Sequence, residues 1–489
     1  MTKRRCSNPE APLIERAFDR KREELGVRCG FPPEVEAAAR DAAGRAAAAA
    51  AGHADRTGVP FVTIDPPGSR DLDQALHIER SDSGLRVWYA IADVGCFVER
   101  GGAVEREAWL RGVTFYAPDR RETLYPPALS EGAASLLPDD ARPAVVFRLD
   151  LDARAELVGS TVERAVVHSR AQLTYAQALE HVEGGGAKFT GEEWADSLVL
   201  LKEFGELRRA REVERGGVSL PIPSQHVERS AATRLGYELE YEEPNAAEEW
   251  NAQVSLLTGH VAALRMLAAR VGILRLLPPV EKERVHKFRH VARALGFRWP
   301  QETGYAEFIR SLDPAHPNAT ALVWQAKRVM QGADYAAFDG EPPADPLHHA
   351  LAMPYAHVTA PLRRLADRYV LDLLVRLEGG GQPDRPERET LGAVAEVMNA
   401  AETRSARLER AVVDVAEAFL LRERIGERFP ATVLGIRGGR AEVQIERPPV
   451  RVEAARPEGA RFLNLGERVE VRLAGVSVEE GKLEFVVEE

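Results

Sequence analysis

Residues 61–76 read FVTIDPPGSRDLDQAL, and this stretch decides how the rest of the chain is interpreted. Its first four residues are β-branched or aromatic, which predicts a short strand. The segment 66–69 cannot continue a helix or a central strand, so the backbone is expected to turn there. The turn would return Asp65 toward Asp71 and Asp73, whose spacing of two points both carboxylates to one side of an extended segment. The sequence therefore predicts three acids around one spot.

Three carboxylates gathered in this way repel one another unless a cation lies among them or one of them takes up a proton. Carboxylate oxygens are hard ligands that suit Mg²⁺ or Mn²⁺, and such ions commonly carry phosphate substrates. The acids alone leave a second interpretation open, which is a solvated acidic turn. Gln74 follows Asp73, and its amide offers a ligand oxygen without a charge.

The composition indicates a soluble globular protein with length for two or more domains. Its 489 residues are 45% hydrophobic and 29% charged, with a net charge of −11, unlike a simple basic nucleic-acid binder. A basic channel inside an acidic surface stays compatible with that charge. Three cysteines without CxxC spacing argue against structural zinc and a disulfide framework. No stretch approaches the roughly 18 apolar residues of a membrane span, so we expect a cytoplasmic protein without a membrane partner.

Five further segments carry residue patterns with chemical content. They are 88–94 (WYAIADV), 112–118 (GVTFYAP), 169–175 (SRAQLTY), 247–251 (AEEWN) and 355–367 (YAHVTAPLRRLAD). In the last segment, Pro361 suits the first turn of a helix and Thr359 is placed to cap it. Arg363 would then lie near a helix N-terminus, where backbone N–H groups and the helix dipole favour a phosphate. A surface ion pair is the alternative for a single arginine.

Together with the acidic segment, these patterns resemble those of the ribonuclease II (RNB) family of hydrolytic 3′-to-5′ exoribonucleases. The resemblance implies that Asp65, Asp71 and Asp73 are catalytic and bind Mg²⁺, or Mn²⁺ in its place. It puts Gln74 at a fourth metal-binding position, where the family has an acid. It also implies that Arg363 stabilises the negative charge that develops on the phosphate during cleavage.

The same resemblance implies a set of RNA-binding side chains. They are Tyr116, Tyr175, Glu248, Glu249, His357 and Arg364. One tyrosine, Tyr116, would stack on the 3′-terminal base, because every base has a π face. One of the two glutamates would accept hydrogen bonds from ribose hydroxyls, the groups that distinguish RNA from DNA. Half-buried core aromatics and acids at a helix N-terminus are the alternatives for these residues.

We predict a multidomain α+β protein. Residues 1–55 are expected to form a helical segment resembling a helix-turn-helix hairpin, with the alanine run at 46–51 inside the second helix. Residues 56–427 would be a large mixed α/β RNB-like catalytic domain. Residues 428–489 alternate in short runs with glycine turns, which resembles an all-β OB or S1-like barrel. About 55 residues cannot hold the two cold-shock-like barrels of many family members, which predicts a wider entrance for structured RNA.

The predicted function is a magnesium-dependent, hydrolytic 3′-to-5′ exoribonuclease that degrades single-stranded RNA to 5′-mononucleotides. We expect it to act as a monomer without a small-molecule cofactor. The alternative is a non-catalytic RNA-binding protein built on a decayed RNB domain, which the amide of Gln74 favours. A DNA nuclease is a further alternative. The mechanism requires Arg363 to face the acidic segment across the folded chain.

Overall fold

The computed structural model spans residues 1–489, and most of the chain is described. The described residues are 12–46, 50–138, 140–218, 224–229, 237–242, 245–313, 316, 318–445, 447–448, 450–457 and 461–488. Cys6 and residues 47–49 of the alanine run lie outside these ranges. Every helix within them is too short or too polar to span a membrane.

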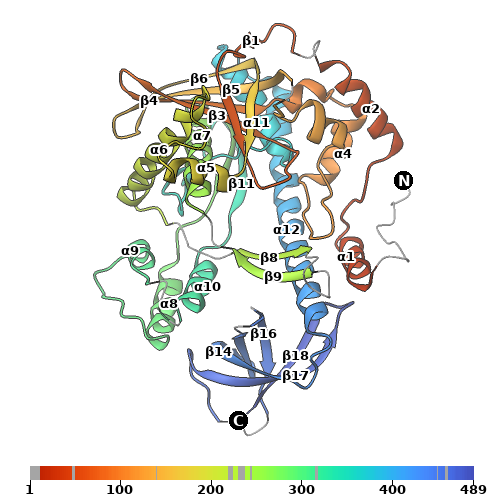
Figure 1. Ribbon diagram of the computed structural model, residues 1–489, viewed down its shortest axis with the longest axis vertical. Coiled ribbons are helices and arrows are strands. Elements are labelled where there is room, and N and C mark those ends of the chain that lie inside the picture. The colour runs from red at the N-terminus through yellow and green to blue at the C-terminus, as the bar shows by residue number, and fades with distance from the viewer. Residues whose placement is uncertain are drawn as a thin grey trace.

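A seven-stranded sheet forms the centre of the larger part of the molecule (Figure 1). Its strands are β1 (Ala54–Asp55), β2 (Phe61–Ile64), β3 (Gln74–Ser81), β4 (Gly84–Ala92), β5 (Arg142–Asp152), β6 (Leu157–Val167) and β7 (Ser169–Leu173). They lie in the order β1-β6-β5-β4-β3-β2-β7, with parallel pairs at both edges and antiparallel pairs between them. The strand predicted from FVTI is β2, and all four of its residues are buried.

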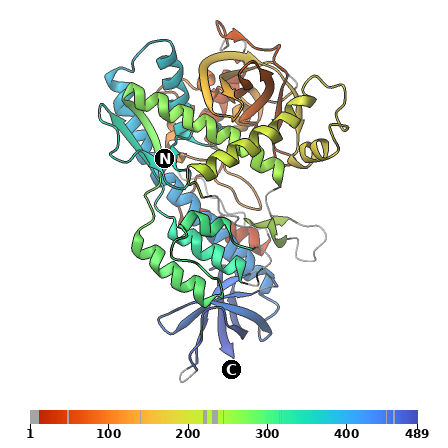
Figure 2. The same cartoon turned by 90° about the vertical axis from the view of Figure 1, so that its left-hand side faces the viewer.

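Helices cover the sheet and extend the domain below it. They are α4 (Ala103–Arg111), α5 (Tyr175–Glu183), α6 (Ala195–Glu214), α7 (Ala246–Ala269), α8 (Lys282–Ala294), α9 (Tyr305–Arg310), α10 (Ala319–Val329), α11 (Leu365–Glu378) and α12 (Arg385–Leu421). Helices α5, α6 and α7 pack on one another, and α6 lies against β3 (Figure 2). Helix α11 packs on β6 and α7. A 3₁₀ turn at Val94–Phe97 (η1) and a π turn at Leu129–Ala133 (η2) complete this layer.

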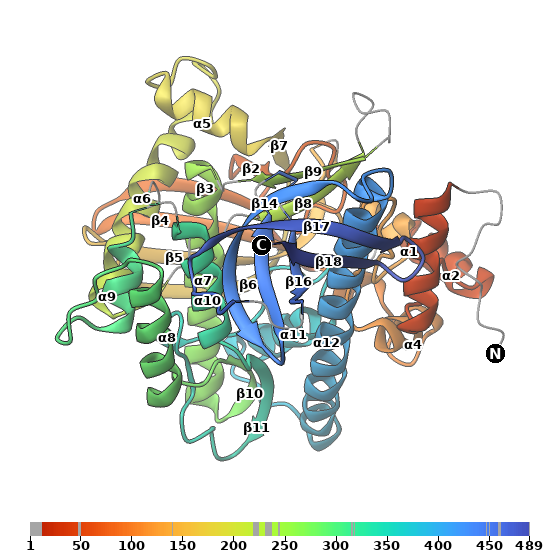
Figure 3. The same ribbon diagram turned by 90° about the horizontal axis from the view of Figure 1, so that it is seen from below.

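Helix α12 connects the two ends of the molecule, and apolar residues recur along the buried face of its 37 residues. It starts with a capping box, in which Asp384 and Glu387 each accept a hydrogen bond from the other's backbone N–H, and with Pro386 in the first turn. Its length carries it from β10 and β11 to β17 and β18 of the C-terminal domain (Figure 3). The helix therefore joins the sheet-containing part of the molecule to the C-terminal domain.

The C-terminal domain is a closed five-stranded barrel, which confirms the predicted OB or S1-like fold. Its strands are β14 (Arg428–Arg437), β15 (Arg440–Ile445), β16 (Arg451–Ala455), β17 (Arg468–Ser477) and β18 (Lys482–Glu488). Short two-stranded ladders occur elsewhere, namely β8 (Ser224–Arg229) with β9 (Tyr237–Glu242), β10 (Val271–Leu276) with β11 (Asp334–Asp339), and β12 (Leu347–His348) with β13 (Met353–Pro354). Helix α10 docks on the barrel through the pair Arg328–Glu442, at 2.7 Å.

The two N-terminal helices are present as α1 (Leu13–Glu24) and α2 (Pro33–Ala43). Each packs mainly on a different neighbour, α1 on α12 and α2 on α4, instead of on the other as a hairpin. Between them, Arg28 pairs with Glu107 of α4 at 2.7 Å. Cys29 is disulfide-bonded, whereas Cys96 is free.

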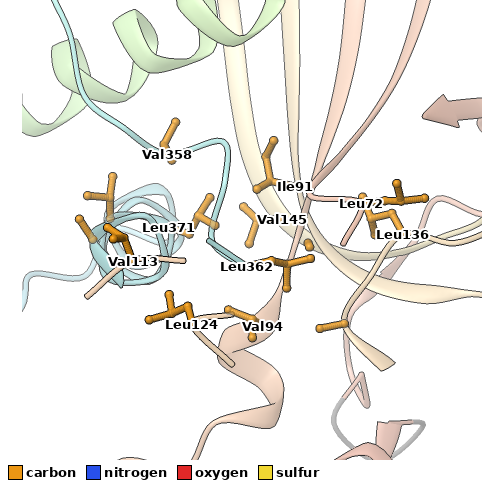
Figure 4. Close-up of a cluster of buried hydrophobic side chains, with 14 of the residues drawn as sticks. Leu72, Ile91, Val94, Val113, Leu124, Leu136, Val145, Val358, Leu362 and Leu371 are labelled. Carbon is orange, nitrogen blue, oxygen red and sulfur yellow. The ribbon is translucent and has the colours of Figure 1, made fainter. Parts of the chain in front are cut away.

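A buried apolar cluster supports the acidic segment from behind (Figure 4). Leu72, between the two aspartates, and Leu362, just before Arg363, are both buried in it beside Ile91 and Val145 of the sheet. Neighbouring residues of an extended segment point to opposite sides, so burial of Leu72 turns the side chains of Asp71 and Asp73 away from it. The apolar residues thus set the direction of the charged ones.

Gly112, between α4 and the segment of Tyr116, offers a test of this packing. Its φ of +76° suits glycine, and a Cβ there would lie 2.5 Å from Cβ of Ala401 in α12. We expect Gly112→Ala to lower the free energy of unfolding by about 1–3 kcal/mol or more, measured by urea denaturation. Gly392→Ala is the control, because it adds a Cβ to the same helix α12 in open space and should stabilise by roughly 0.5–1 kcal/mol. Equal effects of both variants would contradict the packing argument.

Candidate active site

The buried carboxylate of Asp73 joins the acidic segment to the loop that carries Arg363. Asp73 is 3% exposed. Its Oδ1 accepts a hydrogen bond from the N–H of Leu362 at 2.7 Å, and its Oδ2 lies 3.1 Å from Nε of Arg363. The structure therefore brings Arg363 to the acids, as the mechanism requires. The side chain of Arg363 stays 45% exposed and can still be reached from solvent.

Backbone hydrogen bonds attach the segment of Tyr116 to the same loop. The N–H of Thr114 donates to the carbonyl of Arg363 at 3.0 Å, and the N–H of Leu365 donates to the carbonyl of Gly112 at 2.9 Å. Tyr116 is 43% exposed beside this junction. Partial burial raises the pKa of its phenol to about 12, with Arg363 opposing the rise and Asp71 adding to it. An exposed ring face thus lies next to the acids.

The turn before α11 differs from the sequence expectation. Helix α11 begins at Leu365 rather than at Pro361, and residues 361–363 form a turn. The carboxylate of Asp367 holds this turn, because it accepts a hydrogen bond from the N–H of Ala360 at 2.7 Å and pairs with Arg364 at 2.7 Å. Asp367 thus engages the guanidinium of Arg364, which was expected to contact RNA.

His357 lies under this turn, on the side of β11. Its Nδ1 is 2.6 Å from Oη of Tyr335, whose hydroxyl also donates to Glu402 at 2.9 Å. Burial and the nearby arginines hold the pKa of His357 well below its ordinary value, so the ring is neutral at pH 7. The structure thus places His357 against the hydroxyl of Tyr335, within the electrostatic influence of Arg364.

Asp65 and Asp71 complete an electrostatic cluster with Asp73. Burial raises the pKa of Asp65 to about 6 and that of Asp73 to about 7. Arg363 lowers both values, and the charge of Asp71 raises both. A cation bound beside Asp65 and Asp73 would favour their ionised forms and so lower both pKa values.

Arg121 belongs to the cluster, although sequence reasoning did not single it out. Its Nη1 lies 2.5 Å from Oδ1 of Asp71, and its Nη2 lies 2.8 Å from Oε1 of Glu131. The signal was weak, because Arg121 follows Tyr116 by five residues in a run of two arginines. Only the fold shows that this guanidinium faces Asp71.

The carboxylates suit a hard cation in their chemistry, but they do not form a compact ligand set as placed. Among the described residues, the one group of three His, Cys, Asp or Glu side chains whose ligand atoms all lie within 4.8 Å is His53, Asp93 and Cys96. That group is a poor cation site, because Nε of Arg164 lies 2.7 Å from Oδ2 of Asp93. Burial raises the pKa values of Asp65 and Asp73, and a cation among the site aspartates would favour their ionised forms.

Gln74 makes a contact that an acid could not make at neutral pH. Its Nε2 donates to the backbone carbonyl of Thr359, in the loop that carries Arg363. An ionised carboxylate has no proton to donate. Asp73 and Gln74 are adjacent on the chain, so consecutive side chains hold the same loop.

Tyr175 and one of the two candidate glutamates lie on the far side of the cluster. Tyr175 opens α5 behind the capping residue Thr174. Burial raises the pKa of its phenol to about 12, and the charges of Asp65 and Glu248 add to the rise. Glu249 instead pairs with Arg209 of α6. The structure thus separates the two glutamates and puts Glu248 near the tyrosine.

The model of the RNB domain matches residues 54–379, and that of the RNase II-type exonuclease C-terminal S1 domain matches residues 427–488. The chain therefore belongs to the RNB family, which confirms the resemblance read from its motifs. Ribonuclease R of Escherichia coli K12 is 28% identical over 479 residues, which cover 89% of this chain and 57% of that protein. Exosome complex exonuclease RRP44 of Homo sapiens is 27% identical, with 69% of this chain and 36% of that protein covered.

The chain thus spans little more than half, or less, of these relatives. Among solved structures, Mycoplasma genitalium RNase R in complex with ribose methylated single-stranded RNA has a TM-score of 0.85 at 19% identity, covering 99% of this chain and 79% of that one. Yeast Ssd1, a pseudonuclease, has a TM-score of 0.67 at 17% identity, covering 88% of this chain and 54% of that one. At these identities the likeness shows the fold alone.

The raised pKa values predict how stability depends on pH. The folded-state pKa values of Asp65 and Asp73, about 6 and about 7, exceed the ordinary value of 3.8. The contribution of these two acids to the free energy of unfolding is therefore fully present below about pH 4. It is lost as the pH rises toward 7, by up to about 1.4 kcal/mol per pH unit for each acid. We expect the melting temperature of the metal-free protein to fall between pH 5 and pH 7.5. The melting temperature of Asp73→Asn should fall less over the same range. An equal decline in both proteins would contradict these pKa values.

The contact of Gln74 gives a second prediction for the site. Gln74→Glu keeps the size of the side chain but removes the donor to the Thr359 carbonyl. At pH 8 we expect it to lower the free energy of unfolding by about 1–3 kcal/mol in urea denaturation. Gln172→Glu is a matched control, since its Nε2 donates to the carbonyl of Ser69 at 2.7 Å on the exposed surface and should cost much less. Equal losses would mean that Gln74 does not hold the loop.

Proposed function

We propose that the protein is a magnesium-dependent 3′-to-5′ exoribonuclease that hydrolyses single-stranded RNA to 5′-mononucleotides. The observation that carries the proposal is the contact of Asp73 with Leu362 and Arg363. This contact places an acidic cluster next to an accessible guanidinium in a domain of the RNB family. The exposed ring of Tyr116 adjoins both. Acids, guanidinium and ring are the three kinds of group that phosphodiester cleavage at an RNA end needs.

The chain's own residues would bind and orient the RNA end. Tyr116 offers a π face to the terminal base, and its backbone connection to the Arg363 loop keeps the base in register with the phosphate. Glu248 would accept hydrogen bonds from ribose hydroxyls, since it lies near Tyr175 whereas Glu249 is paired with Arg209. This assignment accounts for selection of RNA over DNA.

Asp65, Asp71 and Asp73 would hold the divalent ion, and Gln74 could add its amide oxygen. When bound, such an ion lowers the pKa of water and polarises the phosphate. Arg363 would stabilise the negative charge that develops on the phosphate oxygens. Its ion pair with Asp73 positions the guanidinium beforehand, so that no reorganisation is needed during reaction.

Replacement of one carboxylate separates cleavage from binding. Asp73→Asn keeps an oxygen for the N–H of Leu362 but removes the charge opposite Arg363. We expect cleavage of a labelled oligoribonucleotide in Mg²⁺ to fall ~10²-fold or more, while RNA affinity measured by fluorescence anisotropy changes little. Asp82→Asn, at the exposed turn between β3 and β4, is the control and should retain full activity. Near-normal turnover by Asp73→Asn would refute the assignment.

A second candidate is a non-catalytic RNA-binding protein on the same fold. The neutral side chain of Gln74 and the pairing of Arg121 with Asp71 favour it, because Gln74 adds no negative charge and Arg121 balances that of Asp71. Incubation of RNA with Mg²⁺, with and without chelator, separates the two candidates. Mononucleotides only in the presence of Mg²⁺ support the enzyme, whereas an intact oligonucleotide that still binds supports the second candidate. A matched oligodeoxynucleotide tests a DNA nuclease.

A further inference from the structure

A separate cavity of about 740 Å³ lies between α4, β6, α11 and the start of α12. None of the acidic-cluster residues lines it. Its volume falls within the roughly 300–1,000 Å³ of sites that hold small molecules. The proposed exoribonuclease function does not use this cavity.

The walls of the cavity are rich in arginine. Four arginines and three carboxylates line it, and Arg164 among them is paired with Asp93 and Asp372. Arg100 and Arg376 lie 3.0 and 2.7 Å from the same oxygen, Oε1 of Glu387. One carboxylate balances only one of these two guanidinium groups. Both arginines are substantially exposed and can turn toward a ligand.

A third arginine is buried against the cavity with donors unused. Arg368 is 3% exposed, and its Nη2 donates to the carbonyl of Val98 at 3.0 Å. In the part of the chain that the structure describes, Nε and Nη1 of Arg368 have no acceptor in good hydrogen-bond geometry, although the hydroxyl of Tyr125 interacts with this guanidinium. The Nη1 atom lies 3.1 Å from Glu105, as an ion pair outside hydrogen-bond geometry. Buried donors in native proteins normally have acceptors, so Arg368 indicates an oxygen-rich ligand.

Two aromatic rings are held rigidly in the same wall. The indole N–H of Trp109 donates to Oη of Tyr369 at 2.7 Å, and the hydroxyl of Tyr369 donates to Glu105 at 2.8 Å. The rings are 5.8 Å apart and nearly perpendicular. Rigid aromatic side chains suit the face or edge of a flat ligand ring. The lining guanidinium groups, in contrast, disfavour a metal ion.

We propose that this cavity binds a small organic anion that carries a flat ring and is the size of a mononucleotide. Arg100, Arg368 and Arg376 would bind its phosphate, and Trp109 with Tyr369 would contact its ring. The cavity is distinct from the acidic cluster, but α11 lines it and directly follows the Arg363 loop. Mononucleotides are also the products of the proposed reaction, so the ligand would be available wherever that reaction runs. Binding itself requires no catalysis.

Isothermal titration calorimetry of the full chain with adenosine 5′-monophosphate tests the proposal. We expect binding that weakens at least tenfold in the double variant Arg100→Ala/Arg376→Ala and in the cavity-filling variant Thr390→Phe. Arg385→Ala is the matched control, because Arg385 is on the same helix, 89% exposed, and pairs with Glu389. It should bind as the unmodified protein does.

Two further arms separate this cavity from the proposed active site. Binding should persist in Tyr116→Ala, which removes the ring expected to hold an RNA end. Inorganic phosphate and adenosine should each bind at least tenfold more weakly than the monophosphate. The proposal is overturned if the monophosphate does not bind at millimolar concentration, if Tyr116→Ala abolishes binding, or if both cavity variants bind normally. None of these outcomes depends on RNA cleavage, so the proposed function can fail without this inference failing.

Discussion

One buried carboxylate organises the functional half of this molecule. Asp73 accepts the N–H of Leu362 and pairs with Arg363, so a segment near residue 70 determines where a loop near residue 360 lies. Burying a charge is unfavourable unless hydrogen bonds and an opposite charge accompany it. The raised pKa of Asp73 indicates that this compensation is incomplete. The same contact that holds the fold together therefore keeps the site receptive to a cation.

Two side chains make the charge around that contact less negative than carboxylates alone would. Gln74 carries a neutral amide, which donates a hydrogen bond to the Thr359 carbonyl. Arg121 places a guanidinium beside Asp71. A cation at this site would enter an environment in which two arginines already lie beside its ligands.

Several features were readable from the sequence because local physics determines them. Strand β2 and the strands of the C-terminal barrel follow from side-chain composition and periodicity, which depend on near neighbours. Other features were not readable. Helix α11 begins at Leu365, later than the sequence pattern predicts, because Asp367 binds the turn before it. The N-terminal helices α1 and α2 contact different partners because each apolar face finds a different neighbour in the folded chain.

The sequence by itself determined the family, the fold class and the candidate residues, because motif spacing and apolar periodicity are local properties of the chain. Tertiary structure alone decided which of these residues meet. It brought Arg363 to Asp73, Arg121 to Asp71 and Glu248, rather than Glu249, toward Tyr175. It also formed the arginine-lined cavity from four separate elements. The physical reason is that contacts between distant segments depend on how the buried core packs, and no local pattern encodes that.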